Sequence, residues 1–241
     1  MPANTQFKLK DSKPDKDFIE WNEQMSKSFD QEFYYEHSHP CILWIERMRL
    51  TAISNLIKTH MQKNDAVDPI IVEVGCGTGQ VLEEILRKIK TRNLMGIEPL
   101  DEWRQKTHEK VGNKAKIIKG FAEDLPFENN SVDYIVCTEV LEHVIDPNVV
   151  LREFSRIIKN NGLIIVSIPN ENLINNLKKI VDGFKIYNRL FPKIQKHNDW
   201  HIHSLDLKSF KKYIPEELKE ESLIVVPVFL LPLRYVIAFC K

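Results

Sequence analysis

Cysteine is scarce in this chain of 241 residues. The four cysteines are Cys41, Cys76, Cys137 and Cys240. None forms the C-x-x-C pair that is typical of zinc sites and redox motifs, and their wide spacing is unlike that of a disulfide framework. A zinc site and a disulfide framework are therefore both disfavoured. The pattern fits a reducing compartment, and we expect a cytoplasmic protein.

Long apolar runs and an excess of one charge are also missing. No segment approaches the roughly 18 apolar residues of a membrane-spanning helix. The polar segment 1–17 lacks the apolar stretch of a secretory signal, and we expect it to be disordered. The 34 basic and 34 acidic residues give a formal net charge of zero. This balance argues against nucleic acid as a partner, although it leaves room for a local basic patch.

Glycine is rare as well, but three of the eight glycines lie within five residues. The segment 70–86 reads IIVEVGCGTGQVLEEIL, a β-branched run followed by Gly75, Gly77 and Gly79 and then an amphipathic helix pattern. Strand, glycine turn and helix begin a nucleotide-binding α/β unit. The G-x-G-x-G spacing differs from the G-x-G-x-x-G of dinucleotide enzymes. Glu73 would repel a pyrophosphate, whereas it suits a ligand that carries an ammonium group.

The remaining chain alternates short apolar runs with helical patterns. Runs at 94–97, 117–118, 132–138 and 163–168 predict buried parallel strands, and patterns at 101–111 and 147–159 predict helices between them. Residues 160–162 (Asn-Asn-Gly) are expected to end the second helix. Two β-rich runs at 222–228 and 233–239 predict an antiparallel hairpin. Apolar residues at three- and four-residue steps predict helices between 18 and 61.

Acidic residues follow two of the predicted strands. Glu98 lies about twenty residues beyond the last glycine, where nucleotide-binding folds place the carboxylate that holds a ribose. The segment EVLEH, from Glu139 to His143, follows the strand at 132–138. Open α/β sheets bind ligands at the carboxyl ends of their strands. We therefore expect two carboxylates and an imidazole on one side of a turn at the binding site.

Five segments in order carry a resemblance to a known family: EVGCGTG, GIEP, GFAEDLPFENNSVDYIV, CTEVLEHVIDP and LIIVSIPN. The chain from about 70 to 241 resembles the class I S-adenosylmethionine (SAM) dependent methyltransferases. Within that class, its motifs are most similar to those of the ubiquinone-biosynthesis group. The resemblance implies a Rossmann-like α/β fold with a doubly wound seven-stranded sheet. The sheet would be mostly parallel with a C-terminal antiparallel hairpin. We expect a tail and helical extension at 1–66 and the methyltransferase domain at 67–241.

The resemblance also implies roles for individual residues, with SAM as methyl donor and S-adenosylhomocysteine as product. The methionine half of SAM would be lined by Glu73, Gly75, Cys76, Gly77 and Gly79. The adenosine half would be held by Glu98 at the ribose, Pro99 beside the adenine, and Ala122 and Glu123 at the adenine amino group. Thr138 and Glu139 would lie near the methyl donor. A solvated acidic loop is the alternative for Glu123 and Asp124.

Glu142 and His143 are the expected catalytic residues. In some relatives a similar E-x-x-E-H motif binds a divalent metal together with a later histidine, for which His201 is the candidate here. Mixed carboxylate and imidazole ligands suit a hard-to-borderline divalent ion. In other relatives the histidine acts as a base or only packs. A metal site, a base or substrate contact, and a structural role therefore all remain open, and the metal is unspecified.

Two segments flank the predicted sheet and could cover the site. The aromatic residues of 33–35 and Trp44 could cover the SAM pocket or pack in the core. Residues 173–196, within an expected insertion at 169–204, form an apolar stripe surrounded by basic residues. Such a segment can be a substrate lid, a peripheral membrane contact, or a helix packed on the domain with a solvated face.

The expected function is methyl transfer from SAM to a hydroxyl of a small, possibly lipophilic acceptor. An RNA or protein methyltransferase is one alternative, and a non-catalytic protein that binds SAM or another nucleotide is a second. The sequence leaves the oligomeric state open.

Overall fold

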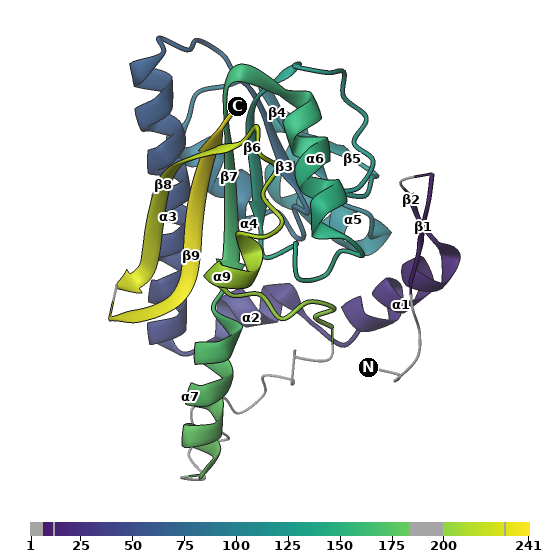
Figure 1. Cartoon of the computed structure of the whole chain (residues 1–241), viewed down its shortest axis with the longest axis vertical. Coiled ribbons are helices and arrows are strands. Elements are labelled where there is room, and N and C mark those ends of the chain that lie inside the picture. Colours follow the sequence, from purple (N-terminus) through teal and green to yellow (C-terminus); the bar gives the residue numbers. More distant parts are fainter. Residues whose placement is uncertain (1–6, 12, 184–199, 229) are drawn as a thin grey trace.

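The structure, a computed structural model, describes residues 7–11, 13–183, 200–228 and 230–241, without the side chains of 178–183. One mixed sheet forms its centre, with helices on both faces (Figure 1). The seven strands are β3 (Ile70–Val74), β4 (Asn93–Ile97), β5 (Lys116–Ile118), β6 (Val132–Thr138), β7 (Ile158–Pro169), β8 (Lys219–Val228) and β9 (Leu231–Cys240).

The strand order in this sheet is β5-β4-β3-β6-β7-β9-β8. The first five strands are parallel, whereas β9 pairs antiparallel with both β7 and β8. The expected fold class and its C-terminal hairpin are confirmed. The order reverses between β3 and β6, which creates a crevice at the carboxyl ends of the strands where ligands bind in such folds.

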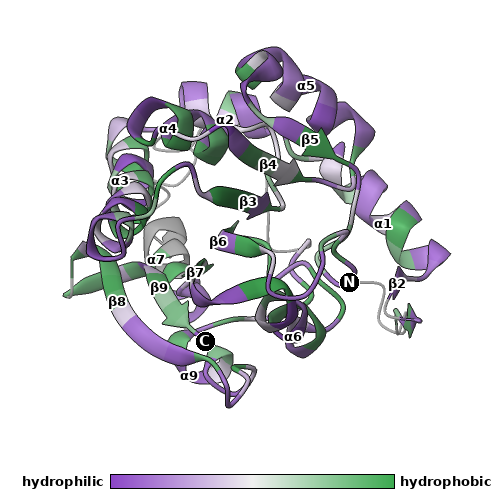
Figure 2. Cartoon of the chain, turned by 90° about the horizontal axis from the view of Figure 1, so that it is seen from above, coloured by the Kyte–Doolittle hydropathy of each residue, from purple (hydrophilic) through white to green (hydrophobic). Residues whose placement is uncertain are grey.

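Alternate residues of each strand point to opposite faces and build two cores. On one face, Ile71 packs with α3 (Pro40–Lys63), α4 (Gln80–Lys88) and α5 (Asp101–Val111). On the other face, Val72 packs with α6 (Pro147–Ile157) and with Phe210 of α9 (Leu207–Phe210). Figure 2 shows the largely hydrophobic strands between these two groups of helices. A short 3-10 turn, η1 (Gly112–Lys114), joins α5 to β5.

The N-terminal region is more ordered than expected. Residues 7–11 and 13–17 carry a small hairpin of β1 (Leu9–Lys10) and β2 (Lys13–Pro14) and the start of α1 (Lys16–Ser26), so the expectation of disorder through residue 17 is wrong for them. Asp15 accepts hydrogen bonds from the backbone N–H of Lys8 (2.9 Å) and of Phe18 (2.9 Å). The ring of Phe7 packs on Phe18 at a centroid distance of 5.4 Å.

The expected helices follow as α1, α2 (Gln31–His37) and α3. Figure 1 shows α1 and α2 at the same end of the sheet as α7 (Glu171–Gly183), which follows β7 directly. This end carries the carboxyl termini of the parallel strands. The remainder of the expected 173–196 segment lies outside the described residues.

The end of α6 differs from the expectation. The helix stops at Ile157, and β7 already begins at Ile158 and includes residues 160–162. Ile158 has extended geometry (φ −68°, ψ 140°), so the chain passes from helix to strand without a glycine cap. Val132 pairs with Ile158 and Tyr134 with Leu163, and a register shift between these pairs accommodates the extra residues. Within the described residues, no helix combines the length and hydrophobicity needed to cross a bilayer.

Candidate active site

The glycine turn after β3 has the backbone conformation that the sequence predicts. Gly75, Gly77 and Gly79 have positive φ angles of 73°, 55° and 87°. A Cβ on Gly75 would lie 2.3 Å from a methyl group of Val140, so a side chain there would be both strained and crowded. The N–H groups of Gly75 and Cys76 donate to the carbonyl of Ile97 at 2.8 and 3.0 Å. These contacts hold the turn against the end of β4.

Glu98 lies next to this turn, directly after β4. Its Oε2 accepts a hydrogen bond from Gly77 N (3.0 Å), and its Oε1 accepts one from Leu100 N (3.1 Å). Burial raises the pKa of Glu98 to about 7, although the two backbone N–H groups act in the opposite direction. The backbone therefore fixes this carboxyl group in a single orientation beside the glycines.

Glu73 lies inside the end of β3 and is only 1% exposed. Its Oε2 has no hydrogen-bond partner among the described residues. Burial raises the pKa of Glu73 well above its usual range. A buried carboxyl oxygen without a partner is costly, and such groups are common at ligand sites. The position suits the ammonium group of an amino-acid ligand.

A cavity of about 600 Å³ joins the glycine turn to the end of β6. Most of the residues that the sequence singled out line it: Glu73, Gly75, Cys76, Gly77, Glu98, Pro99, Thr138, Glu139, Glu142 and His143. The later histidine, His201, lines it too. The structure thus brings together side chains from segments that are far apart in the sequence.

Three expected cofactor residues lie outside the cavity lining. Gly79 is the N-cap of α4 and packs against Thr107. Ala122 belongs to the hydrophobic core, and Glu123 is 3% exposed and accepts a hydrogen bond from Ile145 N (3.2 Å). Glu123 is therefore not part of a solvated loop. Contacts of Ala122 and Glu123 with adenine remain predictions.

The EVLEH segment forms the expected turn after β6. Glu139 has a positive φ of 55°, and His143 N donates to Val140 O at 2.8 Å. Glu142 is buried, and its Oε2 has no hydrogen-bond partner among the described residues. Burial, followed by the nearby charge of Glu139, raises the pKa of Glu142 well above its usual range.

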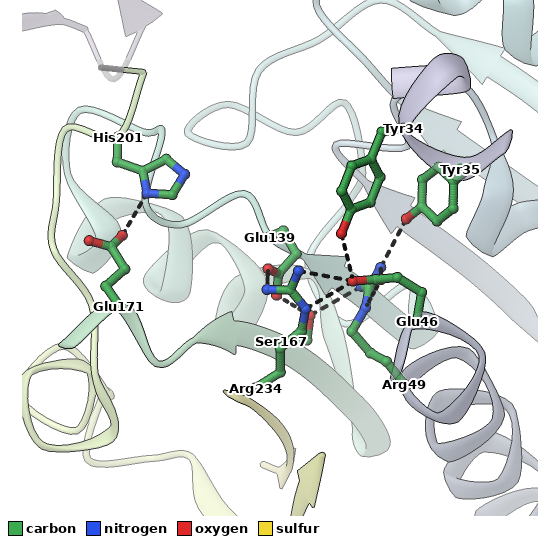
Figure 3. Close-up of polar contacts among 9 residues, drawn as sticks. All are labelled: Tyr34, Tyr35, Glu46, Arg49, Glu139, Ser167, Glu171, His201 and Arg234. Atoms are coloured by element: carbon green, nitrogen blue, oxygen red, sulfur yellow. Dashed lines mark hydrogen bonds and ion pairs between the residues drawn. The ribbon is translucent and has the colours of Figure 1, made fainter. Parts of the chain in front are cut away.

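Hydrogen bonds orient the two histidines beside Glu142. His143 Nδ1 lies 3.2 Å from the carbonyl oxygen of Trp200. Because a carbonyl can only accept, Nδ1 carries the proton in the neutral ring, and Nε2 is the basic nitrogen. His201 Nδ1 lies 2.7 Å from Glu171 Oε1 (Figure 3). The two imidazole rings approach each other with their centroids 4.8 Å apart.

Glu142, His143 and His201 could share a cation. Each offers one ligand atom, and these atoms all lie within 4.8 Å of one another. One carboxylate and two imidazoles form a donor set that suits a borderline divalent metal. The same geometry also suits proton transfer by His143, so the arrangement is compatible with both roles.

A network of charges that the sequence patterns did not predict lies on the other side of the cavity (Figure 3). Arg49 Nε donates to Glu46 Oε2 at 2.9 Å, and Arg234 donates to Glu46 Oε1 at 2.9 Å and to Glu139 Oε2 at 2.6 Å. Ser167 Oγ donates to the second oxygen of Glu139 at 2.9 Å. The network thereby connects α3 to β9, to the end of β6 and to β7.

Two aromatic residues of α2 extend this network. Tyr35 OH accepts from Arg49 at 3.1 Å, and Tyr34 OH lies 3.4 Å from Glu46 Oε1. Both tyrosines line the cavity, which agrees with a covering role, whereas Trp44 is 53% exposed. Phe33 instead stacks on His37 at a centroid distance of 4.2 Å.

A sequence signal for this network exists. Glu46 and Arg49 are three residues apart and fall between Ile42 and Ile53 on the apolar stripe of α3. Charged residues on a buried face need partners, because an isolated buried charge is very costly. The helical periodicity of the apolar residues predicts the helix but does not indicate that this charged pair lies on its buried face.

Comparisons with known proteins show which family and which fold this chain resembles. Residues 72–166 match the family model of a methyltransferase domain. A solved SAM-dependent methyltransferase of Thermotoga maritima, described as a possible histamine N-methyltransferase, shares the fold with a TM-score of 0.59. That alignment has 17% identity and covers 91% of this chain and 99% of the other. Residues 72–166 thus form a methyltransferase domain, and the described chain has the fold of a SAM-dependent methyltransferase.

Curated relatives give a more particular similarity. The ubiquinone biosynthesis O-methyltransferase of Vibrio campbellii is 34% identical over 126 residues, which are 51% of this chain and 53% of that protein. The protein of the same name from Colwellia psychrerythraea is 33% identical over 150 residues, 59% of this chain and 60% of that protein. The matched part thus spans somewhat more than half the length of these relatives.

Proposed function

We propose that this chain transfers a methyl group from SAM to a hydroxyl of a small acceptor with apolar character. The observation that carries the proposal is the continuous cavity between two sets of groups. One set is the glycine turn with Glu98, and the other is Glu142 with His143 and His201. Donor and acceptor could therefore meet in one cavity.

The donor end of the cavity fits the parts of SAM. Glu98 is held by two backbone N–H groups and keeps lone pairs that can accept hydrogen bonds from the ribose hydroxyls. The unpartnered oxygen of Glu73 suits the ammonium group. The glycine turn allows the ligand to approach the backbone closely. These features support binding of SAM and of S-adenosylhomocysteine.

The chemical task left to the protein is alignment and removal of a proton. SAM supplies an electrophilic methyl group, which is transferred by in-line displacement. His143 would accept the proton of the acceptor hydroxyl at Nε2, while the Trp200 carbonyl holds its Nδ1–H. Glu142 and His201 lie beside this ring. They would either stabilise the protonated imidazole or hold a divalent cation with it.

The rest of the cavity favours an uncharged, apolar acceptor. Its wall includes several aliphatic residues: Ile42, Ile45, Ile174, Leu177 and Leu233. Both arginines that line it, Arg49 and Arg234, are already paired with carboxylates. An anionic acceptor would therefore gain little from them. The name of the similar O-methyltransferases supports a hydroxyl as the methylated group.

Calorimetry and a methyl-transfer screen test the proposal. We expect micromolar binding of S-adenosylhomocysteine and no binding of NAD. The screen would pair labelled SAM with phenols, catechols and alcohols, each with and without a long alkyl chain. Tight NAD binding would contradict the donor assignment. Transfer to RNA or protein alone would support the macromolecular alternative, and binding without transfer to any acceptor would support the non-catalytic one.

A further inference from the structure

Gln31 begins helix α2 and lies directly on the glycine turn. Asp30 caps this helix by accepting a hydrogen bond from Phe33 N at 3.0 Å, which fixes where the helix starts. Gln31 Oε1 then accepts a hydrogen bond from Thr78 N at 2.8 Å. A residue 47 positions earlier in the chain therefore makes a direct contact with the predicted SAM-binding turn.

The glycine turn is shaped to receive this side chain. A Cβ on Gly77 would lie 2.5 Å from Gln31 Oε1 and 2.9 Å from Gln31 Nε2. The carboxamide thus occupies the space that any other residue at position 77 would fill. Gly77 N at the same time donates to Glu98. Gln31 and Glu98 therefore both contact the glycine turn, and both line the same cavity.

The hydrogen-bonding capacity of Gln31 is only partly used. Because Thr78 N can only donate, the amide atom facing it is the oxygen. The Nε2 group makes no hydrogen bond to any described residue, so two N–H donors remain for another partner. These donors are neutral. They lie at an end of the cavity that is rich in carboxyl groups, where Glu73 and Glu98 are both buried.

A ligand with an amino-acid part brings both an ammonium and a carboxylate to this end. The ammonium favours the ionised form of these acidic residues, whereas the carboxylate gains nothing from ionised neighbours and needs N–H donors. We propose that Gln31 is a cofactor-binding residue that donates from Nε2 to the carboxylate of the amino-acid part of SAM. This inference rests on the proposed function, since it requires that SAM binds in this cavity.

The experiment compares two ligands that differ only in this part. Calorimetry would measure the affinities for S-adenosylhomocysteine and for 5′-methylthioadenosine. The second ligand has the adenosine and the thioether but no amino-acid carboxylate. Gln31→Ala should lower the affinity for S-adenosylhomocysteine by about tenfold to a hundredfold, which is the range for loss of a hydrogen bond to a charged group. The affinity for 5′-methylthioadenosine should change less than about twofold by the same reasoning.

Gln31→Glu separates ligand binding from a structural role. This variant keeps an oxygen for Thr78 N but removes the donors, so it should lose S-adenosylhomocysteine affinity at least as strongly as Gln31→Ala. Gln24→Ala on the exposed surface of α1 is the matched control and should bind both ligands normally. Thermal melting would verify that each variant is folded.

Several results would overturn the inference. Normal S-adenosylhomocysteine binding by Gln31→Glu would mean that Gln31 only ties α2 to the turn. Equal losses for both ligands in Gln31→Ala would have the same meaning, as would unchanged affinities in both variants. If the unaltered protein binds neither ligand, the proposed function itself fails, which is a distinct outcome.

Discussion

Two kinds of carboxyl group line the cavity, and they differ in what surrounds them. Glu46 and Glu139 are paired with arginines and hydrogen-bonded at both oxygens. Glu73 and Glu142 each keep one oxygen without a hydrogen-bond partner among the described residues. All four line a single cavity, and the paired Glu46 is as buried as Glu73 and Glu142, so partners and not depth separate these three.

The two kinds of group also differ in their protonation. Burial alone would raise the pKa of Glu46, but the guanidinium groups of Arg49 and Arg234 outweigh it and hold the pKa at about 2. Burial raises the pKa of Glu73 and of Glu142 well above the usual range. The paired set, Glu46 and Glu139, therefore has its hydrogen-bond and ion-pair partners within the protein. The unpaired set, Glu73 and Glu142, lacks such partners, and a cationic or hydrogen-bonding ligand would stabilise the ionised form of its carboxyl groups.

Removal of His143, which adjoins the unpaired Glu142, should have the largest effect on activity. We expect His143→Ala to lower turnover by about 10²–10⁴, the usual contribution of a positioned base. Affinity for S-adenosylhomocysteine should be nearly unchanged, because Glu98 and the glycine turn are intact. Steady-state kinetics with the acceptor from the screen, together with calorimetry, would measure both quantities.

The control for this variant is His108→Ala, at an exposed position on α5. If Glu142, His143 and His201 hold a metal, EDTA should abolish turnover and Mg²⁺ or a transition metal should restore it. Turnover that is indifferent to both EDTA and His143→Ala would leave alignment as the only catalytic device. In that case the argument for a hydroxyl acceptor would also be lost.

Breaking the paired set should instead affect stability. Arg234→Met removes the cation shared by Glu46 and Glu139. Glu46 keeps Arg49 as a partner, whereas Glu139, whose side chain is 23% exposed, loses its ion pair. Loss of one partner from a fully buried ion pair typically costs about 3–5 kcal/mol, and the part exposure of Arg234 and Glu139 places the expected cost at the lower end, about 3 kcal/mol. Urea denaturation should therefore show a large decrease in the free energy of unfolding. Arg152→Met, at an exposed position on α6, should cause no measurable change. A stable Arg234→Met protein would mean that the network is dispensable.

The contrast between the two sets also explains what the sequence could reveal. Glu73 lies inside the end of β3, whereas Glu98 and Glu142 follow strands, and the sheet topology brings strand ends together in folds of this type. Local patterns were therefore sufficient to predict these residues and the seven-stranded sheet. The helix–strand junction at Ile158 was missed because tertiary pairing with Val132 overrode the asparagine and glycine signal.

The paired set depends on contacts between distant segments. Arg234 and Glu46 are 188 positions apart, and no local pattern relates them. Gln31 and Thr78 are likewise joined only by the path of the N-terminal helices across the end of the sheet. The hairpin at β1 and β2 was missed because Asp15 and the aromatic ring of Phe7 stabilise it, although its composition resembles that of a disordered segment.

Glu98 lies between the two kinds of group and gives the smallest effect that we predict. It is buried like Glu73, but backbone N–H groups hold both of its oxygens, and its pKa is about 7. The ionised form is the better acceptor for ribose hydroxyls, so the affinity for S-adenosylhomocysteine should rise as the pH increases through 7. At pH 6 about one tenth of the protein carries ionised Glu98, which predicts roughly tenfold weaker binding than at pH 8.

Calorimetry at pH 6, 7 and 8 would measure this dependence, with Glu98→Gln as the control. The variant cannot ionise at this position and should bind more weakly than the unaltered protein at pH 8, with little change between pH 6 and 8. An equal pH dependence in both proteins would assign the titration to another group. No dependence in either protein would mean that the protonated Glu98 holds the ribose as well as the carboxylate does. Glu98 would then behave like the paired set, as a group completed by the protein's own hydrogen bonds.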